Sequence, residues 1–264
     1  MKVLFFGDVV GEPGLKALER ELPRLRALHQ PDFIIANGEN LDITEPKLGR
    51  AGMSLESLNR LLALGVDAVT GGNHSFDPPW LEEVLGHPRV LRPLNYGPQA
   101  PGRGVLLLEK EDQRLQVVNL AGRSALPLVD SPIEAMAQVL AEGPAGAVVV
   151  DFHSESVFEK LGFAFLFDGQ VAAVLGTHTH VPTADARILP KGTAYVSDVG
   201  MVGPEGGMQG YEPQFWVEAQ RLRLPPRNLQ LRWASGPVRM SYVVLQIEDG
   251  KALQIQHSYQ IVGV

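Results

Sequence analysis

The sequence predicts an α/β fold in which two sheets pack face to face with helices outside. Through the first two-thirds of the chain, short runs of β-branched and aromatic residues alternate with helical patterns, which is typical of βα units around a largely parallel sheet. The tail instead carries two strand-like runs joined by Asp249-Gly250, a favoured two-residue hairpin turn. We found no internal repeat and no Pro/Ser linker, so we expect residues 1–264 to form a single domain.

Each strand is predicted from a short apolar run bounded by turn residues. The runs in the first two-thirds are 3–6, 33–36, 68–70, 105–108, 116–120, 147–150, 171–175 and 194–196. The tail adds 242–247 and 253–261.

Leucine spacing and capping residues predict the helices. A stripe of Leu at steps of three or four covers 15–28, with Pro23 as a kink or early stop. Ser54 can cap a helix that stops at Gly65, and Ser131 opens a capping box whose helix closes at Gly143. We expect a Gly-rich loop over 203–210 and a helix over 214–222. The Leu stripes are interpreted as core packing.

Composition limits the chemistry. The 264 residues include no Cys, which excludes disulfides, thiolate metal sites and cysteine nucleophiles, so any metal is held by nitrogen and oxygen. The net charge of −7 disfavours binding to a nucleic-acid polymer or an anionic membrane. The apolar start is too short for a signal peptide, and no stretch approaches the roughly 20 apolar residues of a membrane span. We therefore expect a cytoplasmic protein.

Polar residues follow five of the predicted strands. Each set stands where a strand ends: Asp8; Glu39 and Asn40; Asn73 and His74; Asp151 and His153; His178 and His180. Open α/β sheets bind ligands at the carboxyl ends of their strands, so we expect all five sets to face one cleft.

Each set alone is weak evidence, because Asp and Asn after Gly are usually turn residues and a lone His is more often structural. Their combination is more informative, since four of the seven His residues fall at these strand ends beside carboxylates and amides. About seven nitrogen and oxygen ligands exceed the needs of one tetrahedral ion and suit two neighbouring metals, with Glu39 or a hydroxide as the bridge. Such a ligand set favours iron, manganese, zinc or cobalt over calcium.

These motifs carry a family resemblance. Gly-Asp, Gly-Glu-Asn, Gly-Gly-Asn-His, a Phe-flanked His and Gly-Thr-His-Thr-His occur in an order that resembles the calcineurin-like metallophosphoesterase superfamily, and within it the bacterial YmdB-like branch of dinuclear-metal phosphodiesterases. The resemblance runs from residue 1 to about 210. It implies a four-layer α/β/β/α metallophosphoesterase sandwich with two packed mixed sheets.

The resemblance also implies roles for single residues. Asp8, Glu39, Asn40 and His180 would surround one metal, and Glu39 would bridge to a second metal held by Asn73, His153 and His178. His74 would stay free of metal and act on the substrate. Val10 stands where the wider superfamily has a His ligand, which leaves the first metal richer in oxygen. The chain departs from the branch over 41–46 and 154–158, so substrate size does not transfer.

The resulting hypothesis is a phosphodiesterase that depends on two divalent metals, iron or manganese first, with zinc, cobalt or magnesium as alternatives. A metal-bridging hydroxide would attack phosphorus in line with the leaving oxygen, and His74 would protonate that oxygen. The branch is associated with 2′,3′-cyclic nucleotides, which makes a small phosphodiester the expected partner, and a homo-oligomer is plausible from the same resemblance. Arg123 and Lys160 are candidate phosphate contacts, although solvated charges are the commoner interpretation.

Two other functions fit parts of the pattern. An amidohydrolase also uses a His-x-His after a strand, but generally on an early strand rather than at 178–180. A metal-dependent regulatory or RNA-associated protein with incidental catalysis is the alternative from a different class.

Overall fold

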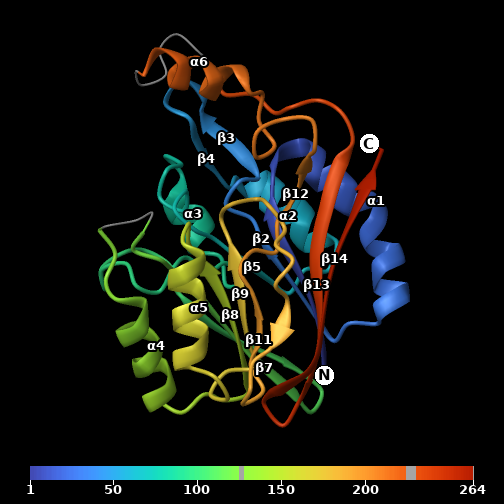
Figure 1. The fold of residues 1–264 in the computed structure, drawn as a ribbon, viewed down its shortest axis with the longest axis vertical. Helices are drawn as coiled ribbons and strands as arrows, with labels where there is room; N and C mark the ends of the chain where they lie inside the picture. The colour runs from blue at the N-terminus through green and yellow to red at the C-terminus, as the bar shows by residue number, and fades with distance from the viewer. Residues whose placement is uncertain (125–127, 224–229, 264) are drawn as a thin grey trace.

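A computed structural model describes residues 1–124, 128–223 and 230–263. Two six-stranded sheets lie face to face in the middle of the molecule (Figure 1). Helices α1 (Gly11–His29), α2 (Leu55–Ala63) and α3 (Leu81–Leu85) cover one outer face, and α4 (Pro132–Ala141) and α5 (Val157–Leu166) cover the other. The predicted four-layer α/β/β/α sandwich is confirmed.

The first sheet joins the two ends of the chain. Its strand order is β14-β13-β12-β1-β2-β5. The bounds are β1 (Lys2–Val9), β2 (Phe33–Asn37), β5 (Ala68–Thr70), β12 (Met201–Pro204), β13 (Val238–Glu248) and β14 (Lys251–Val262). β1 pairs in parallel with β2 and β12, and antiparallel with β13. Asp249 and Gly250 form the expected turn, both with positive φ. The C-terminal hairpin therefore extends the N-terminal sheet instead of forming a sheet of its own.

The second sheet has the order β10-β11-β9-β8-β7-β6. Its strands are β6 (Val105–Lys110), β7 (Gln113–Ala121), β8 (Ala147–His153), β9 (Ala173–Thr177), β10 (Arg187–Ile188) and β11 (Ala194–Val196). A small separate ribbon pairs β3 (Asp42–Glu45) with β4 (Arg50–Gly52), and a 3-10 turn (Pro46–Leu48) connects them.

Several element ends differ from the sequence prediction. β8 continues to His153 instead of stopping at 150, and β9 runs over 173–177 instead of 171–175, because both strands keep their parallel pairing to the register His153↔Thr177. β12 begins at Met201 and takes the first residues of the expected loop, where it pairs with β1.

Two helices also differ from prediction. α1 continues through Pro23, because the Leu stripe on either side of it is buried against the first sheet and outweighs one lost backbone hydrogen bond. α5 was not predicted, since exposed Phe158 hides its amphipathic pattern, although Ser156 caps it by accepting from the Glu159 amide. α6 (Gln214–Leu222) matches its prediction. Among the described helices, none is both long and apolar enough to cross a membrane.

Alternation along β1 shows how the layers are held together. Val3 and Phe5 point between the two sheets, while Leu4 and Phe6 point to the helices on the outer face, and all four are fully buried. Val117 and other inward-facing residues of the second sheet pack against Val3 and Phe5 in the same core cluster. With both sheets fixed in this way, the carboxyl ends of their parallel strands meet at one edge of the sandwich.

Candidate metal centre

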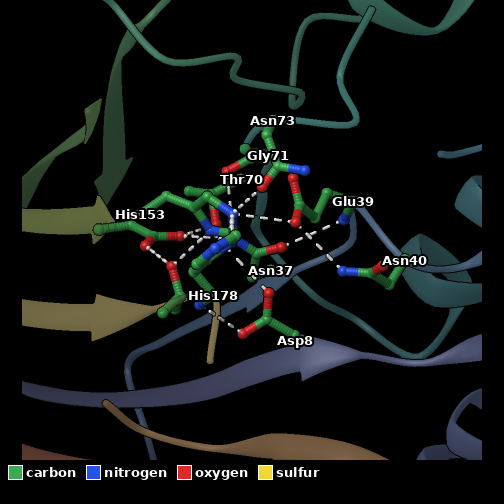
Figure 2. A network of polar contacts seen from close by, with 12 residues as sticks. Asp8, Asn37, Glu39, Asn40, Thr70, Gly71, Asn73, His153 and His178 are labelled. Carbon is green, nitrogen blue, oxygen red and sulfur yellow. Dashed lines mark hydrogen bonds and ion pairs between the residues drawn. The ribbon is translucent and has the colours of Figure 1, made fainter. Parts of the chain in front are cut away.

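The structure brings all eight predicted site residues together at this edge. They come from both sheets: Asp8 lies in β1, Glu39 and Asn40 follow β2, Asn73 and His74 follow β5, His153 ends β8, and His178 and His180 follow β9. Figure 2 shows side chains from these elements pointing toward one another. Five of the eight are buried, and Asn73, His74 and His178 are half-buried at the opening.

One half of the site converges on a single ring nitrogen. The Nε2 atom of His153 lies 2.9 Å from Oε1 of Glu39, 2.9 Å from Oδ1 of Asn73 and 3.0 Å from Nδ1 of His178. The far nitrogen of the His178 ring, Nε2, pairs with Glu155 at 3.1 Å. Nδ1 of His178 therefore faces the centre of the cluster.

The other half lies around Asp8. Its Oδ1 is 3.7 Å from Nε2 of His180, and the opposite ring nitrogen of His180 bonds the Gln209 carbonyl at 2.8 Å. Asn40 bridges the halves, because its Nδ2 contacts Oε1 of Glu39 at 3.2 Å and Nε2 of His180 at 3.3 Å. The Tyr211 hydroxyl donates to Oδ1 of Asn40 at 2.8 Å. An Asn40 ligand would turn its amide over, and the hydroxyl could then accept the bond.

The chemistry of these atoms fits bound cations. Nδ1 of His153 bonds the Thr177 hydroxyl at 2.9 Å, and that hydroxyl donates to Asp151 at 2.6 Å. Nδ1 is therefore a donor, so in the neutral ring Nε2 would present a lone pair to the lone pairs of its neighbours. Oδ1 of Asp8 is buried with no hydrogen-bond partner among the described residues. Ligand atoms of Glu39, His153 and His178 lie within 4.8 Å of one another. A cation would satisfy these opposed lone pairs.

Gly72 makes this close approach possible. A Cβ atom there would stand 2.2 Å from Oε2 of Glu39 and 2.4 Å from Nε2 of His153. Both distances are far inside van der Waals contact, so any side chain at this position would displace the cluster. The Gly-Gly pair ahead of Asn73 thus leaves room for the side chains of the cluster, in addition to allowing a tight turn.

Opposite charges shift the ionisation of the cluster. Burial lowers the pKa of His153, but the Glu39 carboxylate outweighs burial and raises the pKa to about 9. A proton on Nε2 therefore satisfies the surrounding lone pairs at neutral pH, and a bound cation would displace that proton. Burial raises the pKa of Glu39, yet contact with His153 lowers it overall. Burial and the neighbouring His153 lower the pKa of His178 to about 3, which keeps that ring neutral, as a metal ligand must be.

His74 stands beside the cluster and has a partner of its own. Its backbone amide donates to Glu39 at 3.1 Å, while Nδ1 of its ring lies 2.7 Å from Oδ2 of Asp77. Burial lowers the pKa of His74, but the Asp77 carboxylate outweighs burial and raises the pKa overall. Sequence reasoning missed Asp77, although its spacing three residues after His74 was a usable signal.

Residues behind the cluster hold the ring of His153 in place through the Thr177 hydroxyl. Asp151 is fully buried on the same face of β8 as His153 and accepts from Thr177, Thr70 and Asn37. Burial raises the pKa of Asp151 to about 6. From the sequence, Asp151 is recognisable only as a strand-end residue, although the two-residue spacing to His153 places both on one strand face.

Of the two candidate phosphate contacts, Lys160 departs from both interpretations of the sequence, whereas Arg123 is exposed, as the commoner interpretation expects. Lys160 is neither a solvated charge nor a phosphate contact, because its side chain is fully buried and its ammonium pairs with Asp198 at 3.0 Å. The reason is that α5, which was not predicted, directs this residue into the protein. Arg123 is exposed, and its backbone amide bonds Glu159.

A cavity of about 220 Å³ opens over the cluster. Its lining includes ligand candidates of the cluster together with Trp216 of α6 and Leu231. An anionic group at the cluster would therefore share the cavity with an aromatic and an aliphatic side chain.

Comparison with known proteins decides the family. A family model described as YmdB-like protein matches residues 4–258. The chain belongs to the YmdB-like family. This confirms the resemblance found in the sequence motifs and extends it beyond residue 210 into the C-terminal hairpin.

The relatives of this YmdB-like chain match it over nearly its whole length. It is 38% identical over 261 residues to a 2′,3′-cyclic-nucleotide 2′-phosphodiesterase of Bacillus subtilis, which covers 97% of this chain and 96% of the relative. A crystal structure of a hypothetical protein from Thermus thermophilus is similar with a TM-score of 0.90 and 39% identity, covering 99% of this chain and 100% of that one. A Mycoplasma pneumoniae phosphatase structure follows with a TM-score of 0.88 and 30% identity, covering 100% and 94%.

Proposed function

We propose that this YmdB-like protein is a metal-dependent phosphodiesterase that opens 2′,3′-cyclic nucleotides. The observation that carries the proposal is the convergence of Glu39, Asn73 and His178 on Nε2 of His153, within 3.0 Å. The name of the Bacillus subtilis relative, which matches nearly the whole chain, supports the substrate class.

Two divalent cations are assigned to the cluster. Asp8, Asn40 and His180 would hold one, Asn73, His153 and His178 the other, with Glu39 shared between them. When bound, the cations would polarise the phosphate and supply a nucleophilic water near neutral pH. Carboxylate, amide and imidazole ligands without sulfur favour iron or manganese, and zinc, cobalt and magnesium are the alternatives to compare.

His74 is assigned the proton transfer to the leaving oxygen. Its ring carries a proton more readily than an ordinary His because Asp77 bonds Nδ1, which leaves Nε2 as the atom that meets the substrate. A general acid works best with a pKa near the operating pH, and an imidazole meets that condition. His74 is half-buried and lines the cavity, so it is reachable from the substrate side.

The cavity suits a small diester. It offers about 220 Å³ lined by the cluster and by Trp216 and Leu231, enough for a phosphate and part of a nucleoside. A net charge of −7 would repel a polyanion more strongly than a singly charged diester. A 2′-phosphodiesterase, as the Bacillus subtilis relative is named, adds water to the cyclic phosphate and breaks the bond between phosphorus and the 2′ oxygen. The product is a nucleoside 3′-phosphate.

A substrate panel tests this proposal. Protein loaded with Mn²⁺ is assayed on 2′,3′-cyclic AMP, 3′,5′-cyclic AMP, 3′-AMP and an acyl amide, and products are separated by chromatography. We expect 3′-AMP from the first substrate and little turnover of the last two. Turnover of the amide alone, or of monoesters in preference to the cyclic diester, would refute the proposal.

A further inference from the structure

A buried ion pair lies directly behind the His178–His180 loop. Lys160 of α5 is fully buried, and its Nζ lies 3.0 Å from Oδ2 of Asp198, which is itself 1% exposed. Asp198 follows β11, the neighbour of β9 in the second sheet. Burying two charges costs desolvation energy, and an apolar pair of similar volume often stabilises a core as well or better. Stability alone is thus a poor explanation for this pair.

Both members of the pair bond the backbone of the loop. Nζ of Lys160 donates to the Thr177 carbonyl at 2.9 Å, and the Thr179 amide donates to Oδ2 of Asp198 at 3.0 Å. The other carboxylate oxygen accepts from the Gly200 amide at 2.8 Å. The pair therefore hydrogen-bonds the backbone of Thr177, which precedes His178, and of Thr179, which lies between the two His residues.

The loop needs these hydrogen bonds because two of its residues have positive φ angles. His178 has φ of 105° and His180 has φ of 63°, values in the left-handed region that residues with a side chain seldom adopt. Such conformations persist where the surrounding structure fixes them, and they are concentrated at functional sites. These φ values turn the two rings toward Asp8, Asn40 and His153.

We propose that Lys160 and Asp198 are positioning residues, which hold the His178–His180 backbone in its ligand-presenting shape before any metal binds. The inference rests on the metal ligands of the proposed function. A direct role in phosphate binding is excluded by the burial of both side chains and by their bonds to each other and to the loop.

Substitution of Lys160 separates positioning from simple stability. Lys160→Met keeps the length of the side chain but removes the donor to the Thr177 carbonyl and leaves Asp198 unpaired. We expect Mn²⁺ affinity to fall about 10- to 100-fold, as is usual when partners behind metal ligands are lost. Met136→Ala in α4 is the control, because Met136 is buried in the core cluster of the same outer layer, and that cluster includes no residue of 177–180. Affinity is measured by titration at a temperature at which circular dichroism shows each protein folded.

The charge-neutral variant Lys160→Met with Asp198→Asn covers the case in which the single variant fails to fold. It removes the unpaired buried charge but still lacks the donor to Thr177, so we expect weakened Mn²⁺ binding here too. Wild-type affinity in either folded variant would overturn the inference. Weakening of equal size in Met136→Ala at matched thermal stability would also overturn it.

Hydrogen exchange on the unaltered protein gives a test that needs no variant. In metal-free protein, the Thr179 amide should exchange as slowly as amides in the middle of β9. Rapid exchange at Thr179 that slows only when Mn²⁺ is added would overturn the inference, since metal rather than the ion pair would then order the loop. If wild-type protein binds no Mn²⁺ at all, the proposed function fails, whereas slow exchange at Thr179 would still show a fixed loop.

Discussion

Nδ1 of His74 lies 2.7 Å from Oδ2 of Asp77, while the backbone amide of the same His74 bonds Glu39. One residue is therefore tied at its backbone to the metal cluster and at its ring to a carboxylate outside the cluster. This arrangement fixes the distance of the imidazole from the cluster without making the ring a ligand. It gives the assigned general acid a defined place and a raised pKa.

Removal of the imidazole should affect chemistry rather than metal binding. His74→Ala should retain both metals and lose about 10²- to 10⁴-fold in kcat on 2′,3′-cyclic AMP, the usual contribution of a general acid. The loss should be much smaller on a p-nitrophenyl diester, whose leaving group needs no proton. Asp77→Asn should lose less than His74→Ala, because the ring remains. Unchanged kcat of His74→Ala on the cyclic diester would contradict the assignment.

Glu39 should be needed for metal occupancy itself. It is 1% exposed and contacts both halves of the site, so Glu39→Gln replaces a shared charge by a neutral amide. We expect loss of bound metal and of activity together, as measured by elemental analysis of the purified variant. Glu155→Gln is the matched control, since the Glu155 side chain is 61% exposed and its carboxylate pairs with the outer nitrogen of His178. Two equivalents of metal with full activity in Glu39→Gln would be incompatible with a shared ligand.

Thr177 should tune metal affinity from behind His153. Thr177→Val keeps the shape of the side chain but removes the hydroxyl between His153 and Asp151. Mn²⁺ affinity should fall about 10- to 100-fold, the range found for such outer partners of ligands. Thr193→Val is the control, because Thr193 is equally buried and its hydroxyl bonds the Val171 carbonyl away from the site. Equal affinities of the two variants would show that the hydroxyl has no specific role.

We predict that the Asp185 carboxylate makes a pH-dependent contribution to the free energy of unfolding. Burial raises its pKa, but hydrogen bonds from Ser197 and Thr183 outweigh burial and lower it overall. A lowered pKa in the folded state stabilises the protein above the unfolded value of about 3.9, and this stabilisation is lost as pH falls through the folded pKa.

The corresponding variant is Asp185→Asn. It should lower the free energy of unfolding by about 0.5–1.5 kcal/mol at pH 7, because solvent screens a carboxylate that is only partly buried, and by less as pH falls below about 4. Urea unfolding at a series of pH values measures the difference. Asp112→Asn, at an exposed acid, is the control. A difference for Asp185→Asn that is the same at every pH would argue against this linkage.

Most of the fold could be predicted from local pattern, because the strands and the Leu-rich helices carry clear periodicity. The pairing of the tail could not, since nothing in β13 specifies that Val243 and Leu245 lie beside Phe5 and Val3 of β1. Such register depends on which apolar faces meet between the sheets. α5 was missed for a related reason, because its exposed apolar residues obscure the buried side that carries Lys160.

The eight site residues were found because strand ends in an α/β sheet converge, so position along the chain predicted position in space. The residues behind them were not found, since Thr177 and Asp198 look like ordinary loop or strand residues until the strands are placed side by side. A ligand candidate is visible in sequence by its type. A positioning residue becomes visible only through its contacts.

The most direct measurement is a titration of metal-free protein with Mn²⁺ in which occupancy and hydrolysis of 2′,3′-cyclic AMP are followed together. We predict no turnover without metal, full turnover as two equivalents bind, and nucleoside 3′-phosphate as the product. Turnover that is independent of added metal and unaffected by a chelator, or binding of metal without any diester hydrolysis, would contradict the account.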